Sequence, residues 1–322
     1  MPIFDRRSFL RLGTAGLGTA LLTNGAAARA PFLGTQVPAF HRFMIGSTEA
    51  TVVSDGPLPL GKPAASFNGF APGEITQLLQ GNFLPTDDIV LEQNILVLNT
   101  GDKLIVFDTG VGTSTMFGPS PGKLPTTLVK AGIQPRDVDA IVLSHAHPDH
   151  CGGLVDADGR AVFPNAQVYI SSADFNFWTD EAKLGSQLKP FIQIARRNLL
   201  PLRDRVVFYA DGQEFLPGVQ ALAAPGHTVG HTMFMITSGS ETFCYAADLA
   251  HHYVLLLENP RGEFVYDTDA KQAASTRARL LDMLAYDRIR LMGYHFPWPG
   301  VGHVVRHGEG FHYIAQPVKT VL

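Results

Sequence analysis

Four side chains that could bind metal ions lie within six consecutive residues near the middle of the chain. They are His145, His147, Asp149 and His150, and two glycines follow shortly after them. In an extended segment side chains alternate between two faces, so His145 and His147 point to the same side. Pro148 then bends the chain and carries Asp149 and His150 onto a turn. Imidazole nitrogen and carboxylate oxygen together form a ligand set that suits Zn²⁺ and related divalent ions.

So many ligands in so short a segment predict two metal ions rather than one. His145 and His147 would hold one ion, and Asp149 and His150 would hold the other. Two ions about 3.5–4 Å apart can share one water molecule, lower its pKa towards neutrality and present it to an electrophile whose oxygen binds a metal. The bridging hydroxide would attack, with Asp149 orienting it and accepting a proton. Such a site needs no serine or cysteine nucleophile.

Short apolar runs bounded by glycine, aspartate and asparagine predict the strands that position these ligands. The expected strands are 50–54, 89–98, 104–107, 140–143, 166–170, 205–209, 219–223, 232–237, 242–246, 288–294 and 310–315. The expected helices are 72–80, 126–131, 184–198 and 270–285, the last with an N-cap among Asp267 to Asp269. Two groups of strands, with helices between and after them, indicate an α/β fold of two stacked sheets with helices outside.

The composition excludes several other classes of protein. The chain has 322 residues, 45% hydrophobic and 17% charged, which allows a large core and excludes a disordered, collagen-like or coiled-coil chain. Two cysteines cannot form a disulfide framework; Cys151 is expected to be a buried thiol, and its pairing with Cys244 stays open. A formal charge of −4 without a dense basic tract argues against nucleic acid as a partner. No repeat or linker interrupts the chain after residue 40, so we expect one domain over 31–322.

The first thirty residues have the composition of an export signal. Arg6 and Arg7 begin the string Arg-Arg-Ser-Phe-Leu, which resembles the twin-arginine signal that sends folded proteins across the bacterial inner membrane. The uncharged run 12–22 is shorter than the roughly 20 residues that a permanent membrane anchor needs. We therefore expect residues 1–30 to be a signal peptide and the twin-arginine export machinery to be a partner. The mature protein would be periplasmic or secreted.

The H-x-H-x-D-H string of residues 145–150 resembles the signature of the metallo-β-lactamase-fold superfamily. Other short strings resemble further elements of that superfamily, in the family's order. They are Asp108-Thr109-Gly110, Gly226-His227-Thr228-Val229-Gly230-His231, Tyr245-Ala246-Ala247-Asp248 and Gly293-Tyr294-His295. The resemblance implies an αββα sandwich, in which two mixed β-sheets are flanked by helices and the metals lie at one edge between the sheets.

The resemblance also implies a role for individual residues. One metal ion would be held by His145, His147 and His227, and the other by Asp149, His150 and His295. Asp248 would bridge the two ions, which we expect to be Zn²⁺. Asp149 and Asp248 would be the catalytic carboxylates. Asp108, His231 and His303 would support the ligands without binding a metal.

Longer stretches resemble enzymes of the methyl parathion hydrolase type and lactonase-like members of the superfamily. They are 116–119, 161–166, 173–178, 216–219, 267–271 and 296–303. In such enzymes aromatic side chains wall a pocket above the metals, and Phe117, Trp178 and Phe191 match those positions. An apolar pocket of this kind suits neutral small molecules. The resemblance thus implies a dinuclear zinc hydrolase of esters, lactones or organophosphate triesters, and it allows a homodimer.

Several alternatives stay open. The protein could be a quorum-signal lactonase with only side activity on organophosphates. The same ligands could hold two iron ions in a redox enzyme, and a metal-loaded protein without catalysis is a third hypothesis. Asp248 stands where true β-lactamases usually place cysteine or histidine, which disfavours lactam hydrolysis. His251 and His252 follow Asp248 closely and are expected to line the pocket, with at least one of them facing solvent.

Overall fold

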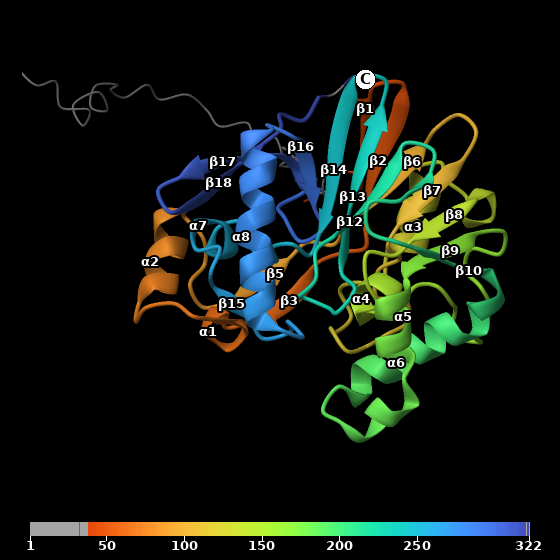
Figure 1. Ribbon diagram of the computed structural model, residues 1–322, viewed down its shortest axis with the longest axis horizontal. Coiled ribbons are helices and arrows are strands. Elements are labelled where there is room, and N and C mark those ends of the chain that lie inside the picture. Colours follow the sequence, from red (N-terminus) through yellow and green to blue (C-terminus); the bar gives the residue numbers. More distant parts are fainter. Residues whose placement is uncertain (1–31, 33–37, 320, 322) are drawn as a thin grey trace, which may run out of the picture. The chain divides into compact units, whose positions relative to one another are not determined.

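The computed structural model describes residues 32, 38–319 and 321, so the expected signal peptide, residues 1–30, lies outside the described residues. From Pro38 onward the chain forms two mixed sheets of seven strands each, packed face to face, with helices on their outer faces (Figure 1). The predicted fold class, an αββα sandwich, is confirmed. Within the described residues no helix is both long and apolar enough to cross a membrane.

The two sheets divide the chain into a first and a second half. In spatial order the first sheet contains β1 (Phe40–Ile45), β2 (Thr48–Ser54), β6 (Asn94–Asn99), β7 (Leu104–Phe107), β8 (Ala140–Val142), β9 (Gln167–Ser171) and β10 (Val206–Tyr209). The second contains β11 (Glu214–Leu216), β12 (Val219–Ala223), β13 (Thr232–Ser238), β14 (Glu241–Ala247), β16 (Arg290–Gly293), β17 (Val301–His307) and β18 (Gly310–Ala315). Two short pairs complete the set: β3 (Leu58–Gly61) with β5 (Ile89–Leu91), and β4 (Phe67–Asn68) with β15 (Glu263–Phe264).

Alternation of side chains along the strands builds two separate apolar clusters. In β14, Phe243 and Tyr245 belong to the core between the sheets, whereas Cys244 and Ala246 belong to a cluster on the outer face of the second sheet. This period of two is the normal consequence of the pleated strand. Across the sandwich the Phe107 ring lies 5.4 Å from the Tyr245 ring. The strand that precedes Asp248 is therefore anchored in the core between the sheets.

Helices cover the sandwich and frame one of its edges. They are α1 (Pro63–Ser66), α2 (Glu74–Gly81), α3 (Leu124–Lys130), α4 (Pro148–Cys151), α5 (Ser172–Thr179), α6 (Lys189–Leu199), α7 (Leu255–Glu258) and α8 (Ala270–Tyr286), with the 3₁₀ turns η1 (Pro135–Asp137), η2 (Glu181–Gly185) and η3 (Leu200–Arg205). In α8, Leu280, Leu281 and Leu284 join the outer cluster of the second sheet. Asp269 caps its start by accepting a hydrogen bond from the Gln272 backbone N–H at 2.9 Å, as predicted for this segment.

Some element boundaries differ from those expected from the sequence. The apolar run 89–98 forms two strands in different sheets, because the chain crosses between them at Glu92 and Gln93. Buried Gln93 supports this crossing by donating a hydrogen bond to the Gly56 carbonyl at 2.9 Å. Strands β1 and β17 were not expected, since histidine and arginine side chains interrupt their apolar pattern. The expected helix 184–198 is a 3₁₀ turn followed by α6.

The strand directions bring four loops to one edge of the sandwich. In the second sheet β12 and β14 both pair antiparallel with β13, and β16 runs parallel to β14, so these three strands end at the same edge. Strand β8 ends beside them, because the backbone N–H of Thr232 donates to the carbonyl oxygen of Ser144 across the two sheets at 3.0 Å. The loops that follow β8, β12, β14 and β16 are therefore neighbours.

Candidate metal centre

The histidine-rich segment forms a short extended piece followed by one helical turn. His147 is extended, with a φ of −68° and a ψ of 156°, as expected for a residue before proline, and it precedes α4. Pro148 occupies the first position of that turn, where a missing N–H is harmless. The turn folds the segment back on itself, so that the His150 ring lies 4.0 Å from the His145 ring.

The remaining predicted ligands come from the second sheet. His227 lies in the loop between β12 and β13, Asp248 directly follows β14, and His295 follows β16. All three side chains are buried. The structure thus brings all the predicted metal ligands into one cluster: His145, His147, Asp149, His150, His227, Asp248 and His295.

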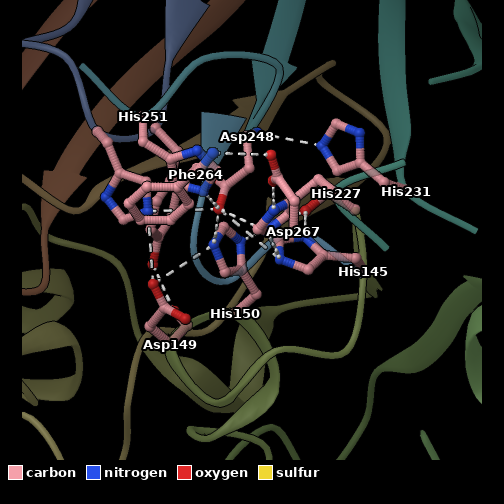
Figure 2. A network of polar contacts seen from close by, with 12 residues as sticks. His145, Asp149, His150, His227, His231, Asp248, His251, Phe264 and Asp267 are labelled. Carbon is pink, nitrogen blue, oxygen red and sulfur yellow. Dashed lines mark hydrogen bonds and ion pairs between the residues drawn. The ribbon is translucent and has the colours of Figure 1, made fainter. Parts of the chain in front are cut away.

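Asp248 stands at the centre of this cluster (Figure 2). Its Oδ2 lies 3.7 Å from Nε2 of His145, 3.2 Å from that of His150, 3.3 Å from that of His227, 3.1 Å from that of His251 and 3.4 Å from that of His295. In a tetrahedral zinc site with bonds of about 2.0–2.1 Å, neighbouring ligand atoms are about 3.3 Å apart. Most of the separations in the cluster therefore match those between ligand atoms around a metal ion.

Outward hydrogen bonds select which ring nitrogen of each histidine faces the cluster. The Nδ1 atom of His227 donates to Asp267 at 2.8 Å, and that of His295 donates to the Glu92 carbonyl at 2.8 Å. The Nδ1 atom of His150 donates to Asp108 at 2.9 Å, and that of His145 donates to the Ser144 hydroxyl at 2.9 Å. A neutral imidazole whose Nδ1 donates carries its lone pair on Nε2. Nε2 of all four rings thus faces the centre, which is the arrangement of metal-binding histidines.

The charges of the cluster also favour bound cations. Although burial opposes it, the neighbouring carboxylates raise the pKa of His150 well above its ordinary value and that of His295 to about 9, so without a metal ion protons on these rings balance the buried carboxylates. Burial and the neighbouring imidazoles lower the pKa of His145 and His147 well below the ordinary value, so both rings are neutral at pH 7. Burial acts to raise the pKa of Asp248, but His150 and His295 outweigh it and hold this pKa well below its usual range. A buried carboxylate is costly unless a positive charge balances it. Nε2 of His150 and Oδ1 of Asp248 also have no hydrogen-bond partner among the described residues. The donor set fits divalent cations.

Asp108 organises the histidine-rich segment from behind. Its Oδ1 accepts the Ser144 backbone N–H at 2.8 Å, and its Oδ2 accepts the Ser144 hydroxyl at 2.8 Å, His150 Nδ1 at 2.9 Å and the Tyr245 hydroxyl at 2.6 Å. The residue has a φ of 63°, a conformation that aspartate and asparagine adopt more easily than most residues. Asp108 therefore ties a ligand, the ligand loop and a strand of the second sheet to one carboxylate.

Two further groups hold the loops together. His231 donates from Nδ1 to the Ala224 carbonyl at 2.9 Å and accepts the Asp248 backbone N–H on Nε2 at 3.1 Å. Burial lowers the pKa of His231 to about 3, so the ring is neutral. Asp174 of α5 accepts the backbone N–H groups of Ala146 at 2.7 Å and Gly230 at 2.8 Å, which joins the two histidine loops. Sequence reasoning did not single out Asp174, because only the fold places these loops side by side.

Asp267 is a supporting residue that the sequence placed near a helix cap and in a stretch resembling related enzymes, without giving it a role in the site. Besides accepting from His227, its carboxylate lies 3.6 Å from the guanidinium of Arg277, which is fully buried. Arg277 also donates to the carbonyl oxygen atoms of Leu249, Pro260 and Gly262. The sequence contains a sign of this buried ion pair: Arg277 precedes Leu280 by three residues, so a charged side chain lies on the apolar face of its helix.

His251 is the polar residue of the site for which the sequence predicted the least. It and His252 are both buried, so the expectation that one of them faces solvent is wrong. His251 stacks on Phe264 with ring centroids 3.9 Å apart, which aims its Nε2 at Asp248. His252 instead accepts the backbone N–H groups of Val254 and Leu255 and holds the start of α7. Packing against Phe264 and α7 therefore buries both rings.

An apolar pocket opens above the cluster. Its polar floor is formed by His147, Asp149, His227, Asp248, His251 and His295, and its walls by Leu58, Leu60, Leu91, Phe117, Phe191, Phe264 and Tyr266. Phe117 and Phe191 thus lie where the sequence predicted. Trp178 does not line this pocket: its ring is buried behind His147, edge-on at 4.8 Å, because α5 packs against the histidine loop. Its expected role in the pocket wall is corrected to support of His147.

His303 also lies away from the site. Strand β17 runs antiparallel to β16, with Gly302 opposite Leu291, so it carries His303 back towards the start of β16. There His303 lines a surface groove with Arg288 and Arg306. The expectation that His303 supports the ligands is wrong. His303 is close to His295 in sequence, but the chain reverses between them and places His303 away from the cluster.

The family of the protein follows from these elements taken together. A family model of the metallo-beta-lactamase superfamily matches residues 88–295, the part of the chain that contains every candidate ligand of the cluster. The chain belongs to the metallo-β-lactamase superfamily. As in the resemblance drawn from the sequence, the superfamily match includes the H-x-H-x-D-H segment and runs to His295.

Relatives within the superfamily include hydrolases. A probable metallo-hydrolase of Mycobacterium tuberculosis is 25% identical over 222 residues, which cover 60% of this chain and 68% of the relative. An N-acyl homoserine lactonase of a Bacillus species is 30% identical over 114 residues, which cover 35% of this chain and 39% of the lactonase. The second match therefore extends over a minority of either protein.

Solved structures of the superfamily match over nearly the whole described chain. AidC, a dizinc quorum-quenching lactonase in complex with a product, N-hexanoyl-L-homoserine, has a TM-score of 0.82 and 33% identity over 88% of this chain and 99% of its own. The hydrolase AbOPH has a TM-score of 0.82 and 25% identity over 88% of this chain and 100% of its own. The protein is a metallo-hydrolase of the β-lactamase fold.

Proposed function

We propose that the protein is a dizinc lactonase that opens neutral lactones carrying an apolar acyl chain. The observation that carries this proposal is the pocket: its walls are aliphatic and aromatic, and among the described residues no lysine or arginine lines it. Walls without a basic side chain offer no partner to an anionic substituent, and leucine side chains suit an alkyl chain. The similarity to AidC, whose structure contains an N-acyl homoserine product, supports N-acyl homoserine lactones as the substrate class.

The residues of the cluster would divide the work of hydrolysis. Two zinc ions, when bound, would activate a water molecule and polarise the substrate carbonyl. Asp149 has the more exposed of the two ligand carboxylates, with 12% of its side chain accessible, and it lines the pocket, where it can orient the water and accept its proton. Asp248 would link the ligand group of His145, His147 and His227 to that of Asp149, His150 and His295. Leu58, Leu60 and Leu91 would contact the acyl chain and exclude bulk water.

A comparison of substrates tests this proposal. We expect zinc-loaded protein to hydrolyse N-hexanoyl-homoserine lactone with a kcat/KM at least about 100-fold above that for an aryl ester or methyl parathion, which corresponds to roughly 2.7 kcal/mol of selective transition-state binding. Elemental analysis and an absorption spectrum of the same sample distinguish colourless zinc from coloured iron. A larger kcat/KM for methyl parathion would instead favour a phosphotriesterase, and inactivity on all three substrates would overturn the proposed hydrolytic function.

Replacing His251 tests the part it has in this site. His251→Phe keeps a ring that can stack on Phe264 but removes the nitrogen that contacts Asp248 at 3.1 Å. We expect both metals to be retained and kcat/KM to fall about 10–100-fold, the usual cost of losing a group that orients a metal ligand. His251→Gln, which keeps a polar end, should lose less. Elemental analysis and lactone kinetics measure both effects, and loss of one metal ion from His251→Phe would contradict this role by showing that His251 is itself a ligand.

A further inference from the structure

A second cluster of side chains with metal-binding chemistry lies outside the pocket. It consists of Glu258 at the end of α7 and His307 and His312 on the β17–β18 hairpin, which lies beside α7 in Figure 1. The possible ligand atoms of these three residues all lie within 4.8 Å of one another. None of them lines the pocket above the candidate centre.

The hairpin places the two histidines on one face. His307 is opposite Gly310 and Val305 is opposite His312, so the histidines are diagonal cross-strand neighbours. Their rings stack with centroids 3.6 Å apart and an angle of 25° between the planes. Nε2 of His312 lies 3.4 Å from Oε1 of Glu258. That separation is close to the roughly 3.3 Å between ligand atoms in a tetrahedral zinc site.

The backbone holds this cluster in place. Gly310 begins β18 against the end of α7, and a side chain there would meet the carbonyl oxygen of Glu258 at 2.2 Å and that of Leu257 at 2.6 Å. Asn82, which follows α2, donates to the Glu258 carboxylate at 3.0 Å and to the Leu78 carbonyl at 2.9 Å. The carboxylate is thus oriented before any ion binds, as outer hydrogen bonds orient the ligands of known metal sites.

We propose that Glu258, His307 and His312 form an additional divalent-metal site on the surface, separate from the catalytic centre. Two imidazoles and one carboxylate are a donor set for Zn²⁺, and water can take the remaining position because the His312 side chain is 40% exposed. A bound ion would join α7 to the β17–β18 hairpin. Since α7 begins four residues after His251, the ion would stabilise the segment that continues from Asp248 and His251.

Counting metal ions tests this site without reference to activity. Protein equilibrated with excess Zn²⁺ and desalted should contain one more ion per chain than the His307→Asn/His312→Asn double variant treated in the same way. His303→Asn is the matched control, because His303 lies on the same strand and the same face of the hairpin but outside the cluster. It should retain the full metal count.

Calorimetry gives a second readout. Titration of Zn²⁺ into protein whose catalytic centre is already loaded should show one further binding event, which the double variant lacks. Both variants change exposed or half-exposed side chains, so each should unfold at the parent's temperature in the presence of a chelator. Equal metal counts in the parent and the double variant, or no further binding event in the parent, would overturn the proposal while leaving the proposed lactonase untouched.

Discussion

Asp248→Asn is expected to abolish lactone hydrolysis and to empty at least one of the two metal positions. The carboxylate oxygen Oδ2 is surrounded by five histidine nitrogens within 3.7 Å, and Oδ1 has no hydrogen-bond partner among the described residues. Asparagine preserves the shape of the side chain but removes the negative charge and one of the two oxygen atoms. Two cations would then lose the ligand that both can share, and their mutual repulsion would no longer be offset.

The expected loss of activity can be scaled from the smaller effect of removing a group that only orients a metal ligand. Loss of a group that merely orients a ligand costs about 10–100-fold in metal affinity or activity, so loss of the shared ligand should lower kcat/KM by more than about 1,000-fold. Elemental analysis and single-turnover kinetics with the lactone measure the two quantities. Asp269→Asn is a matched control, because Asp269 caps α8 and is absent from the cluster. A variant that keeps two metals and near-normal kinetics would show that Asp248 does not bridge them.

Asp108→Asn is expected to have the second largest effect, acting first on stability and then on metal affinity. The carboxylate accepts four hydrogen bonds from three residues, and the side chain is fully buried. Whichever way an asparagine amide turns, its NH₂ group faces at least one donor and cannot accept from it. Asparagine tolerates a φ of 63° as well as aspartate does, so the substitution isolates the hydrogen bonds from backbone strain.

We expect the free energy of unfolding of metal-free Asp108→Asn to fall by about 3 kcal/mol, since each buried donor left without an acceptor costs about 1–3 kcal/mol. His150 also loses its orienting partner, so zinc affinity should fall about 10–100-fold. Denaturation in the presence of a chelator measures the first effect, and competition with a chromophoric chelator measures the second. Asp102→Asn, at an exposed turn, serves as control. Unchanged stability would mean that the carboxylate does not hold the histidine loop.

The sequence predicts the site correctly where the chemistry is local. His145, His147, Asp149 and His150 are close in space largely because they are close along the chain, and Pro148 forces the turn between them. Strand and helix periods were also readable, since a pleated strand and an amphipathic helix impose their own spacing. The helix 270–285 was therefore placed nearly to the residue.

The sequence does not predict a role that depends on what packs behind or opposite a residue. Trp178 is an aromatic residue of the kind that lines pockets, but it lies behind His147. An antiparallel strand carries His303 away from the metal centre. Asp174 and His251 act through loops that come from different strands. Each of these roles is set by a long-range pairing, and neither composition nor periodicity reports which strands become neighbours.

The sequence by itself determined the ligand types through short-range spacing and indicated two stacked sheets through runs of apolar residues, while its resemblance to the superfamily implied the remaining ligands. Only the tertiary structure decided that His251 faces Asp248, that Asp174 and Asp267 hold the loops, and that Trp178 and His303 lie outside the pocket. The physical reason is that strands ending at a common edge place loops far apart in sequence within hydrogen-bond distance. The types of ligand in the centre therefore follow from local sequence, and the positions of these ligands in space are set by the sheets.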